Sequence, residues 1–434
     1  MIPRLIITES ARKAERLASL WPSGRARGMP TNGYLFIPLP ELSPVGVKAD
    51  WTDERVPRHP DWLAAMGDAI SEADEIVIAT DPDAEGEVIA QDVMSVVHRF
   101  SPASKTYRLR LWSLDHAAIA EGVAAMEPVD PEIDSRFWSA AQPGHVRRVI
   151  DRLCATVFGS REKPVGRVLS GFLDVAASQP VPPDGENGDG VTGPGNLADL
   201  FLAGELADLT VQQIYDEAQA LYESGSISYP RTLSRVPVDE FRKAGAGLGE
   251  GAHPALHNTV ARPLLHRLRD YAESEPPGLP PGMRIMVAIE RMTSGGLRRC
   301  PADADPDARA ILRHLMTAGL ARPSTWAGFA THQAQRGLFD HRQGLTARGR
   351  QFQQWQPDWL NADFSRTMES RLTPKTPAPV QIGQLVSEMP RSAQAQIFRM
   401  ISRAETHGNC VVTRHDANRA RLSGADGVTV RGRR

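Results

Sequence analysis

Four acidic residues stand close together in the segment IVIATDPDAEGEVIA, with a spacing that suits a divalent cation. Asp81 and Asp83 follow a short apolar run, and Glu85 opens the helical pattern after it. In an extended backbone, side chains two positions apart point the same way, so Asp81 and Asp83 would lie on one side of the chain. Crowded carboxylates repel one another and offer the oxygen ligands that magnesium prefers. Asp81, Asp83 and Glu85 therefore predict a metal site, although the dipole of a helix N-terminus could by itself explain Glu85 and Glu87.

A second segment, QALYESGSISYPRTLS, could supply a nucleophile for phosphate chemistry. The phenol of Tyr229 has an ordinary pKa of about 10 and needs a nearby cation or proton acceptor to react. Arg231 would face the same side of an extended segment and could stabilise charge on a phosphate. Gln219 and Glu223 lie four residues apart on a predicted helix and share a face. The alternative is an amphipathic strand that buries one tyrosine.

The elements that must position these residues alternate between strand and helix patterns in the first part of the chain. Strands are predicted at residues 5–8, 34–39, 75–80 and 107–114, and helices at residues 11–20, 61–73, 87–97 and 116–126. This alternation predicts a parallel sheet that is covered on both faces. Sites in such sheets lie beyond the carboxyl ends of the strands, where Glu9 and Asp81 stand.

The remainder of the chain is predicted to be mostly helical. Helical patterns occupy residues 131–159, 196–224, 307–320 and 325–335, and residues 283–290 have the pattern of a short strand. Residues 179–195, QPVPPDGENGDGVTGPG, have the composition of a flexible linker. Residues 403–434 are rich in arginine and predict a mobile basic tail.

Composition sets broad limits on the class of protein. The chain has 434 residues, of which 41% are hydrophobic and 24% charged, so several folded domains are expected. The net charge of −2 gives no overall basicity, but a locally basic channel would still bind nucleic acid. Cys154, Cys300 and Cys410 are far apart, which argues against zinc ribbons and disulfides. No apolar stretch is long enough for a bilayer, and a cytoplasmic location is expected.

The acidic pattern D-x-D-x-E-G-E resembles the Toprim domain, in which Glu9 and Lys13 match an early glutamate and lysine. Tyr229, Arg231 and Thr232 resemble the active-site motif of the type IA DNA topoisomerases. Further segments follow in the order of that family and match its DNA-binding positions at Arg147, Asp151, Arg167, Gln219, Glu223, His253, Arg322 and Thr325.

This resemblance implies a fold and a domain order. The expected fold is multidomain α/β and α, with a Toprim-like parallel sheet before a mostly helical topoisomerase core, a reduced β arch and no C-terminal zinc modules. The expected parts are a Toprim domain at 1–128, a first helical part at 129–178, the linker at 179–195, a tyrosine cleavage region at 196–262, an arch remnant at 263–300, a returning helical segment at 301–402 and the tail at 403–434.

The resemblance also implies an activity, namely magnesium-dependent and ATP-independent cleavage, passage and rejoining of single DNA strands. Tyr229 would form a 5′-phosphotyrosine, Glu9 would exchange a proton with the 3′ oxygen, and Lys13 and Arg231 would stabilise the phosphate. His253 would orient the site. The expected partner is single-stranded or underwound DNA, with no membrane and with protein partners unknown. The alternatives are a non-catalytic single-stranded DNA-binding relative and a Toprim nuclease.

Several positions depart from the family pattern. Ala84, Leu169 and Leu233 replace the usual arginine, glutamine and aspartate, and His257 and Asn258 replace arginine and proline. The spans available for the arch barely make one small domain. We therefore expect a much reduced arch, with strand passage cut down and single-strand cleavage kept.

Overall fold

The computed structural model describes residues 2–22, 24–41, 43, 45–126, 128–129, 135–179, 196–231, 280–294 and 304–422. Thr232, His253 and almost all of the predicted linker lie outside these ranges, as does most of the predicted arch remnant.

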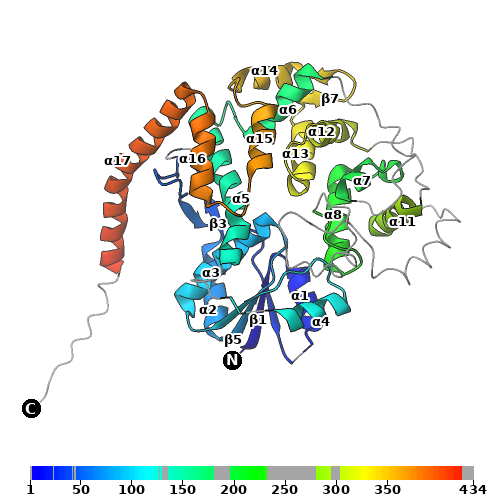
Figure 1. Cartoon of the computed structure of the whole chain (residues 1–434), viewed down its shortest axis with the longest axis vertical. Helices are drawn as coiled ribbons and strands as arrows, with labels where there is room; N and C mark the ends of the chain where they lie inside the picture. The colour runs from blue at the N-terminus through cyan, green and yellow to red at the C-terminus, as the bar shows by residue number, and fades with distance from the viewer. Residues whose placement is uncertain are drawn as a thin grey trace, which may run out of the picture.

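A four-stranded parallel sheet forms the centre of the N-terminal part (Figure 1), as the sequence predicts. The strand order is β2 (Arg27–Pro30), β1 (Ile2–Thr8), β5 (Ala73–Ile78) and β6 (Lys105–Arg108). Ile6 of β1 lies opposite Val77 of β5, so both central strands end at the same edge.

Helices cover both faces of this sheet because its central strands are apolar on both sides. Leu5 and Ile78 belong to a core with α2 (Pro60–Ser71) and α3 (Ala84–Phe100). Ile6 and Val77 point the other way, into a core with α1 (Ala11–Ser19) and α4 (His116–Ala125). The alternation along each strand thus joins the sheet to two separate cores.

Two strands differ from their prediction. The strand expected at 34–39 is β3 (Phe36–Pro38), which pairs antiparallel with β4 (Arg55–Pro57) outside the main sheet. The edge of the main sheet is instead β2, which the sequence analysis missed. A Cβ on Gly28 would lie 2.5 Å from the carbonyl oxygen of Ala14, so glycine allows α1 to pack closely on this strand.

A largely helical region follows, and Figure 1 shows it above the sheet. Its first helices are α5 (Ser135–Leu153), continued by the π-helical turn η1 (Cys154–Phe158), and then α6 (Arg167–Ser178), α7 (Leu197–Leu202), the 3-10 turn η2 (Gly204–Leu206) and α8 (Val211–Glu223). The later elements are α11 (Pro281–Ser294), α12 (Pro306–Thr317), α13 (Pro323–Gln335), the hairpin β7 (Phe339–Asp340) and β8 (Gly344–Leu345), α14 (Ala347–Trp355), α15 (Ala362–Arg371), α16 (Ala378–Glu388) and α17 (Arg391–Leu422).

Two predictions in this region are wrong. Residues 283–290 are helical within α11 rather than a strand of the arch. Ile285 and Ile289, one helical turn apart, are buried in the core that also contains Ile214 of α8, so tertiary packing uses this apolar run as a helix face. The basic segment expected as a mobile tail from residue 403 is helical as far as Leu422. Gly408 and Gly424 are the first glycines after Gly383, and no proline follows Pro390, so little in the sequence stops the helix.

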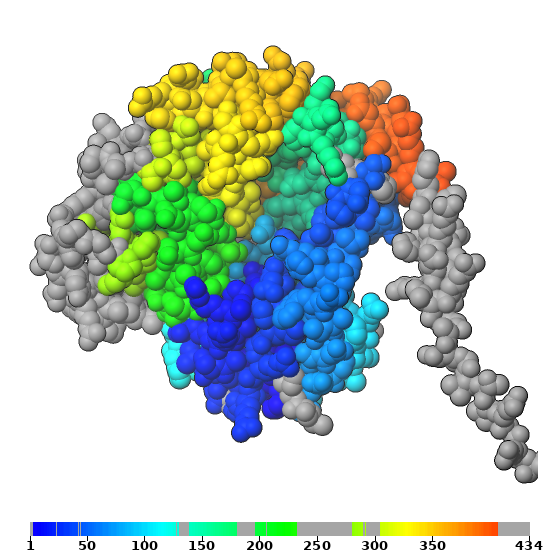
Figure 2. All heavy atoms as spheres, turned by 180° about the vertical axis from the view of Figure 1, so that it is seen from behind, coloured from blue at the N-terminus to red at the C-terminus, as the bar shows by residue number. Residues whose placement is uncertain are grey.

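The core that contains Ile6 extends from the sheet into the tyrosine-bearing part of the chain, where it includes Tyr222 and Tyr229. The space-filling view shows residues around α8, in green, directly against the blue N-terminal domain (Figure 2). A third core joins α5 to α16 and α17 through residues such as Val149, Ile382 and Ile397. Within the described residues, no helix is both long and apolar enough to cross a bilayer.

Candidate active site

The carboxyl edge of the sheet positions the predicted acidic residues. Glu9 follows β1 and Asp81 follows the neighbouring β5, so the two lie side by side. Asp83 caps α3, since its Oδ1 accepts a hydrogen bond from the backbone N–H of Gly86 at 2.8 Å. Ser10 caps α1 through the backbone N–H of Lys13, which fixes the turn that carries this lysine. Helix caps thus orient the residues that follow the strands.

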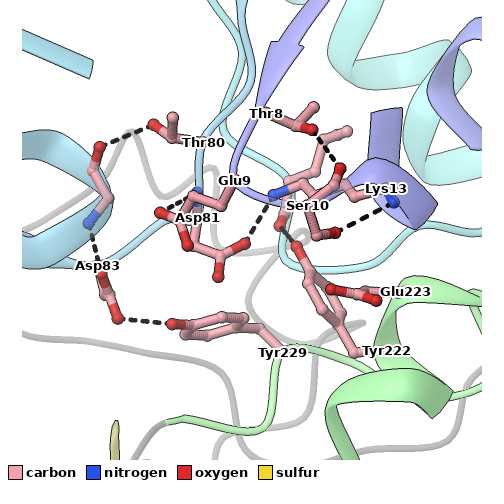
Figure 3. Close-up of polar contacts among 12 residues, drawn as sticks. Thr8, Glu9, Ser10, Lys13, Thr80, Asp81, Asp83, Tyr222, Glu223 and Tyr229 are labelled. Atoms are coloured by element: carbon pink, nitrogen blue, oxygen red, sulfur yellow. Dashed lines mark hydrogen bonds and ion pairs between the residues drawn. The ribbon is translucent and has the colours of Figure 1, made fainter. Parts of the chain in front are cut away.

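Asp81 is the centre of a buried charge cluster (Figure 3). Lys13 Nζ lies 2.7 Å from Asp81 Oδ1, and Arg231 Nη1 lies 3.5 Å from Asp81 Oδ2. The backbone N–H of Asp81 donates to Glu9 Oε1 at 3.3 Å. Burial alone would raise the pKa of Asp81, but Lys13 and Arg231 outweigh it and lower the pKa. The predicted lysine, arginine and aspartate therefore do meet in one place.

Tyr229 reaches the same cluster from a segment 146 residues later than Asp83. Its hydroxyl donates to Asp83 Oδ2 at 2.5 Å, as Figure 3 shows, and its side chain is fully buried. Burial, together with Asp83 and Asp81, raises the pKa of Tyr229 well above its usual value. The phenol is therefore neutral in this arrangement and must lose its proton to an acceptor before it can attack a phosphate.

The ring of Tyr229 lies between two aromatic residues that the sequence analysis did not select. Trp112 and Tyr222 meet it edge to face, with centroid distances of 6.1 and 5.3 Å. The backbone N–H of Tyr229 donates to the carbonyl of Trp112, and the Tyr222 hydroxyl donates to the carbonyl of Leu111, both at 2.8 Å. This segment after β6 was predicted as more strand; it leaves the sheet to hold the tyrosine.

Arg108 holds the acidic loop, which is the segment between β5 and α3, by hydrogen bonds to its backbone. This buried guanidinium donates to the backbone carbonyls of Thr80 and Asp81, each at 3.2 Å, and to Glu87 Oε1 at 2.7 Å. Arg110 pairs with the same glutamate. Burial would raise the pKa of Glu87, but the two arginines outweigh it and lower the pKa. Glu87 thus acts as a structural counterion of these two arginines.

The donor set at the acidic loop fits a hard divalent cation in its chemistry. Asp81 Oδ2 is buried and has no hydrogen-bond partner among the described residues. Burial and Asp83 raise the pKa of Glu85, and burial, Asp81 and Asp83 raise the pKa of Glu9 well above its usual value. These shifts express a repulsion between carboxylates that a cation would relieve.

A different trio has its possible ligand atoms within 4.8 Å of one another in the described part of the chain, namely Asp307, Asp340 and His341. Their contacts have another explanation. Asp307 Oδ1 accepts from the backbone N–H of His341 at 2.8 Å, and Asp340 Oδ1 accepts from the backbone of Arg342 at 2.8 Å. These bonds stabilise the β7–β8 turn.

The predicted DNA-binding residues form two groups. Gln219 Nε2 donates to Glu223 Oε1 at 3.2 Å, which confirms that they share a face of α8. Arg147, Asp151, Arg167 and Arg322 form the second group, and all but Asp151 gather around a residue absent from the prediction, Glu369 of α15. No spacing in the sequence indicates Glu369, because it meets Arg147 across 222 positions.

Thr325 lies in the first turn of α13, which Arg322 caps, and its backbone N–H donates to the Arg322 carbonyl at 2.8 Å. Arg322, Arg231 and Arg147 each act to lower the pKa of Glu85, although burial and Asp83 dominate. The arginine group therefore borders the acidic cluster.

Comparisons with known proteins agree with this geometry. Residues 4–113 match the Toprim domain family. Reverse gyrase 2 of Aeropyrum pernix is 27% identical over an alignment 280 residues long, which covers 61% of this chain and 20% of that protein. The chain therefore spans about a fifth of this curated relative. The structure of full-length topoisomerase I from Thermotoga maritima superposes with a TM-score of 0.60 at 14% identity, covering 93% of this chain and 90% of that one.

The N-terminal part of the chain is thus a Toprim domain, and the fold as a whole is that of topoisomerase I. Together with the reverse gyrase homologue, these findings confirm the predicted resemblance to the type IA DNA topoisomerases.

Proposed function

We propose that this chain is a magnesium-dependent, ATP-independent DNA topoisomerase that cleaves and rejoins single strands through Tyr229. The observation that carries the proposal is the hydrogen bond between Tyr229 and Asp83, which seats a tyrosine from the helical region in the acidic cluster of the Toprim domain. A tyrosine that served only to fill the core would not need to lie beside the charged cluster of Asp81, Lys13 and Arg231.

In the proposed reaction, the Tyr229 hydroxyl gives its proton to Asp83, whose Oδ2 accepts its hydrogen bond, and the Tyr229 oxygen attacks the phosphorus of a single-strand phosphodiester. A bond forms between that oxygen and the 5′ phosphate, and the bond to the 3′ oxygen breaks. The raised pKa of Glu9 favours its protonated form, which suits a group that gives a proton to the departing 3′ oxygen. Lys13 and Arg231 would stabilise the charge on the phosphate. Rejoining reverses these steps without ATP, since the phosphotyrosine keeps the energy of the broken bond.

Asp81, Asp83 and Glu85 are the residues proposed to hold magnesium. When bound, this ion would neutralise the crowded carboxylates and help to position the DNA phosphates. Asp83 would then have to exchange its contact with the Tyr229 hydroxyl for the ion, since its other oxygen caps α3.

Trapping of a covalent adduct tests the proposal directly. The full chain is incubated with magnesium and a single-stranded oligonucleotide, denatured rapidly, digested, and analysed by mass spectrometry. We expect a nucleotide adduct on Tyr229 that disappears in Tyr229→Phe and remains in Tyr215→Phe, which alters a tyrosine of the same region. Relaxation of negatively supercoiled plasmid should follow the same pattern.

Two results would contradict the proposal in different ways. Salt-dependent binding of single strands with no adduct in any condition would favour a non-catalytic DNA-binding relative. Nicks that accumulate without a phosphotyrosine and are not resealed would favour a Toprim nuclease.

A further inference from the structure

Glu369 joins three parts of the helical region at one point. It lies on α15, and its carboxylate accepts from Arg147 Nε of α5 at 2.9 Å and lies 3.1 Å from Nη1 of Arg167, the first residue of α6. The hydroxyl of Ser365, one turn earlier on α15, donates to the backbone carbonyl of Arg167 at 3.3 Å. Helix α15 thus contacts the two arginine side chains through Glu369 and the backbone of α6 through Ser365.

Positively charged side chains surround the Glu369 carboxylate. Burial would raise the pKa of Glu369, but Arg147 and Arg167 outweigh it, with Arg322 adding to their effect, and lower the pKa. Burial and the nearby Arg322 lower the pKa of Arg147, because two guanidiniums repel each other. Without Glu369, the repulsion between Arg147 and Arg322 would lose its main counterweight, while Arg167 would keep its pair with Asp151.

The guanidiniums also keep unused hydrogen-bond donors. Within the described part of the chain, Nη1 of Arg147 and Nη1 of Arg322 are buried and have no hydrogen-bond partner. Buried donors normally find a partner, so free ones beside an active site indicate that an anionic ligand completes them. An arginine can place one edge on a carboxylate and keep other N–H groups for a phosphate.

We propose that Glu369 is a positioning residue that holds Arg147 and Arg167 in the arrangement that receives a phosphate of the DNA strand. This inference rests on the proposed function, because it takes single-stranded DNA as the ligand. Glu369 would not touch the DNA itself.

Simple electrostatics and positioning predict opposite effects of Glu369→Gln. The substitution removes one negative charge beside a bound polyanion, so charge alone would tighten binding. Loss of the carboxylate also frees Arg147 and Arg167 from a charge-assisted contact, so positioning predicts weaker binding. The sign of the change therefore separates the two explanations.

The experiment measures the affinity of the full chain for a fluorescent single-stranded oligonucleotide over a series of salt concentrations. All variants carry Tyr229→Phe, so that no cleavage intervenes. We expect Glu369→Gln to weaken binding roughly tenfold, which is the effect of losing an outer partner that orients a metal ligand. The slope of log affinity against log salt concentration should fall by about one. Glu388→Gln is the matched control, because it makes the same charge change at an exposed pair with Arg371.

Glu369→Asp keeps the charge but has a shorter reach, and it should weaken binding by less than Glu369→Gln. Circular dichroism checks that each variant is folded; if Glu369→Gln is not, the comparison is made with Glu369→Asp. The inference is overturned if Glu369→Gln binds the oligonucleotide as tightly as Glu388→Gln or more tightly. If Glu369→Asp has to replace Glu369→Gln in the comparison, the inference is overturned when Glu369→Asp binds as tightly as the Tyr229→Phe parent. If even the Tyr229→Phe parent does not bind single strands, DNA is not the substrate and the proposed function fails as well.

Discussion

At the scale of single residues, Gly86 fixes the shape of the acidic loop. A Cβ at this position would lie 2.1 Å from the backbone carbonyl oxygen of Asp81, a contact that no side-chain rotation relieves. The loop from β5 to α3 must therefore pass directly over a residue without a side chain, which also lets the Gly86 N–H reach Asp83. This explains the glycine of the D-x-D-x-E-G-E pattern by contact and not by flexibility.

We predict that Gly86→Ala destabilises the fold by roughly 1–3 kcal/mol and abolishes the Tyr229 adduct, because the Asp81 backbone must move. Gly328→Ala is the control, since the space around this α13 glycine is open and alanine favours helix. Urea unfolding measures both variants, and the oligonucleotide adduct is measured in parallel. Equal stability of the two variants would contradict the predicted contact.

At the scale of elements, the segment that follows β6 attaches the tyrosine region to the Toprim domain. Tyr222 and Tyr229 both donate to its carbonyl groups, at Leu111 and Trp112. Because Tyr229 is fully buried in this arrangement, the proposed reaction requires the site to open before a DNA phosphate reaches the hydroxyl. In that proposal, the contacts of this segment would limit how readily the site opens.

Tyr222→Phe should lower the free energy of unfolding by about 1–2 kcal/mol, because it removes the donor to the Leu111 carbonyl in a buried place. Tyr215→Phe on the same helix should cost less, since its hydroxyl bond to the Ser324 carbonyl is long, at 3.4 Å. Chemical unfolding and limited proteolysis compare the two. A larger loss for Tyr215→Phe would show that the Tyr222 bond is not an important attachment.

The same elements show what the sequence could and could not predict. Apolar runs gave β1 and β5, and the positions of Glu9 and Asp81 follow from two adjacent parallel strands. Local spacing also gave the shared face of Gln219 and Glu223. By contrast, the run at 283–290 became a helix because packing against neighbouring helices decides between the two periodicities of a short apolar segment.

Long-range contacts left no local pattern to find. Trp112 contacts Tyr229, and Glu369 contacts Arg167. In each pair the two residues are more than a hundred positions apart, so only the folded chain brings them together. His253, Thr232 and most of the predicted arch remnant lie outside the described residues and stay predictions.

At the scale of the whole molecule, one buried and one half-buried histidine make the stability of the fold depend on pH. His314 of α12 is fully buried between Phe172 and Phe339, and neither ring nitrogen has a hydrogen-bond partner among the described residues. Burial lowers its pKa to about 4. Burial, Arg148 and Arg55 lower the pKa of His145 to about 3. Both rings are therefore neutral in the folded chain at pH 7.

An unfolded histidine has a pKa of about 6.5, so the unfolded chain takes up these protons first. The contribution of neutral His314 is fully present above pH 6.5 and is lost as the pH falls through that value toward 4. Over this window it amounts to roughly 3 kcal/mol. Because other groups of the chain also take up protons in acid, only a comparison between variants isolates this histidine.

We therefore predict that His314→Leu unfolds less readily in acid than the wild-type chain. At pH 7.5 the variant should be about as stable or somewhat more stable, because it replaces unpaired buried nitrogens with an apolar side chain of similar size. At pH 4.5 the difference in its favour should grow. Urea unfolding at pH 7.5, 5.5 and 4.5 measures this, with His98→Gln at an exposed site of α3 as the control. If His314→Leu loses as much stability between pH 7.5 and 4.5 as the wild-type chain does, protonation of this core histidine is not what weakens the fold in acid.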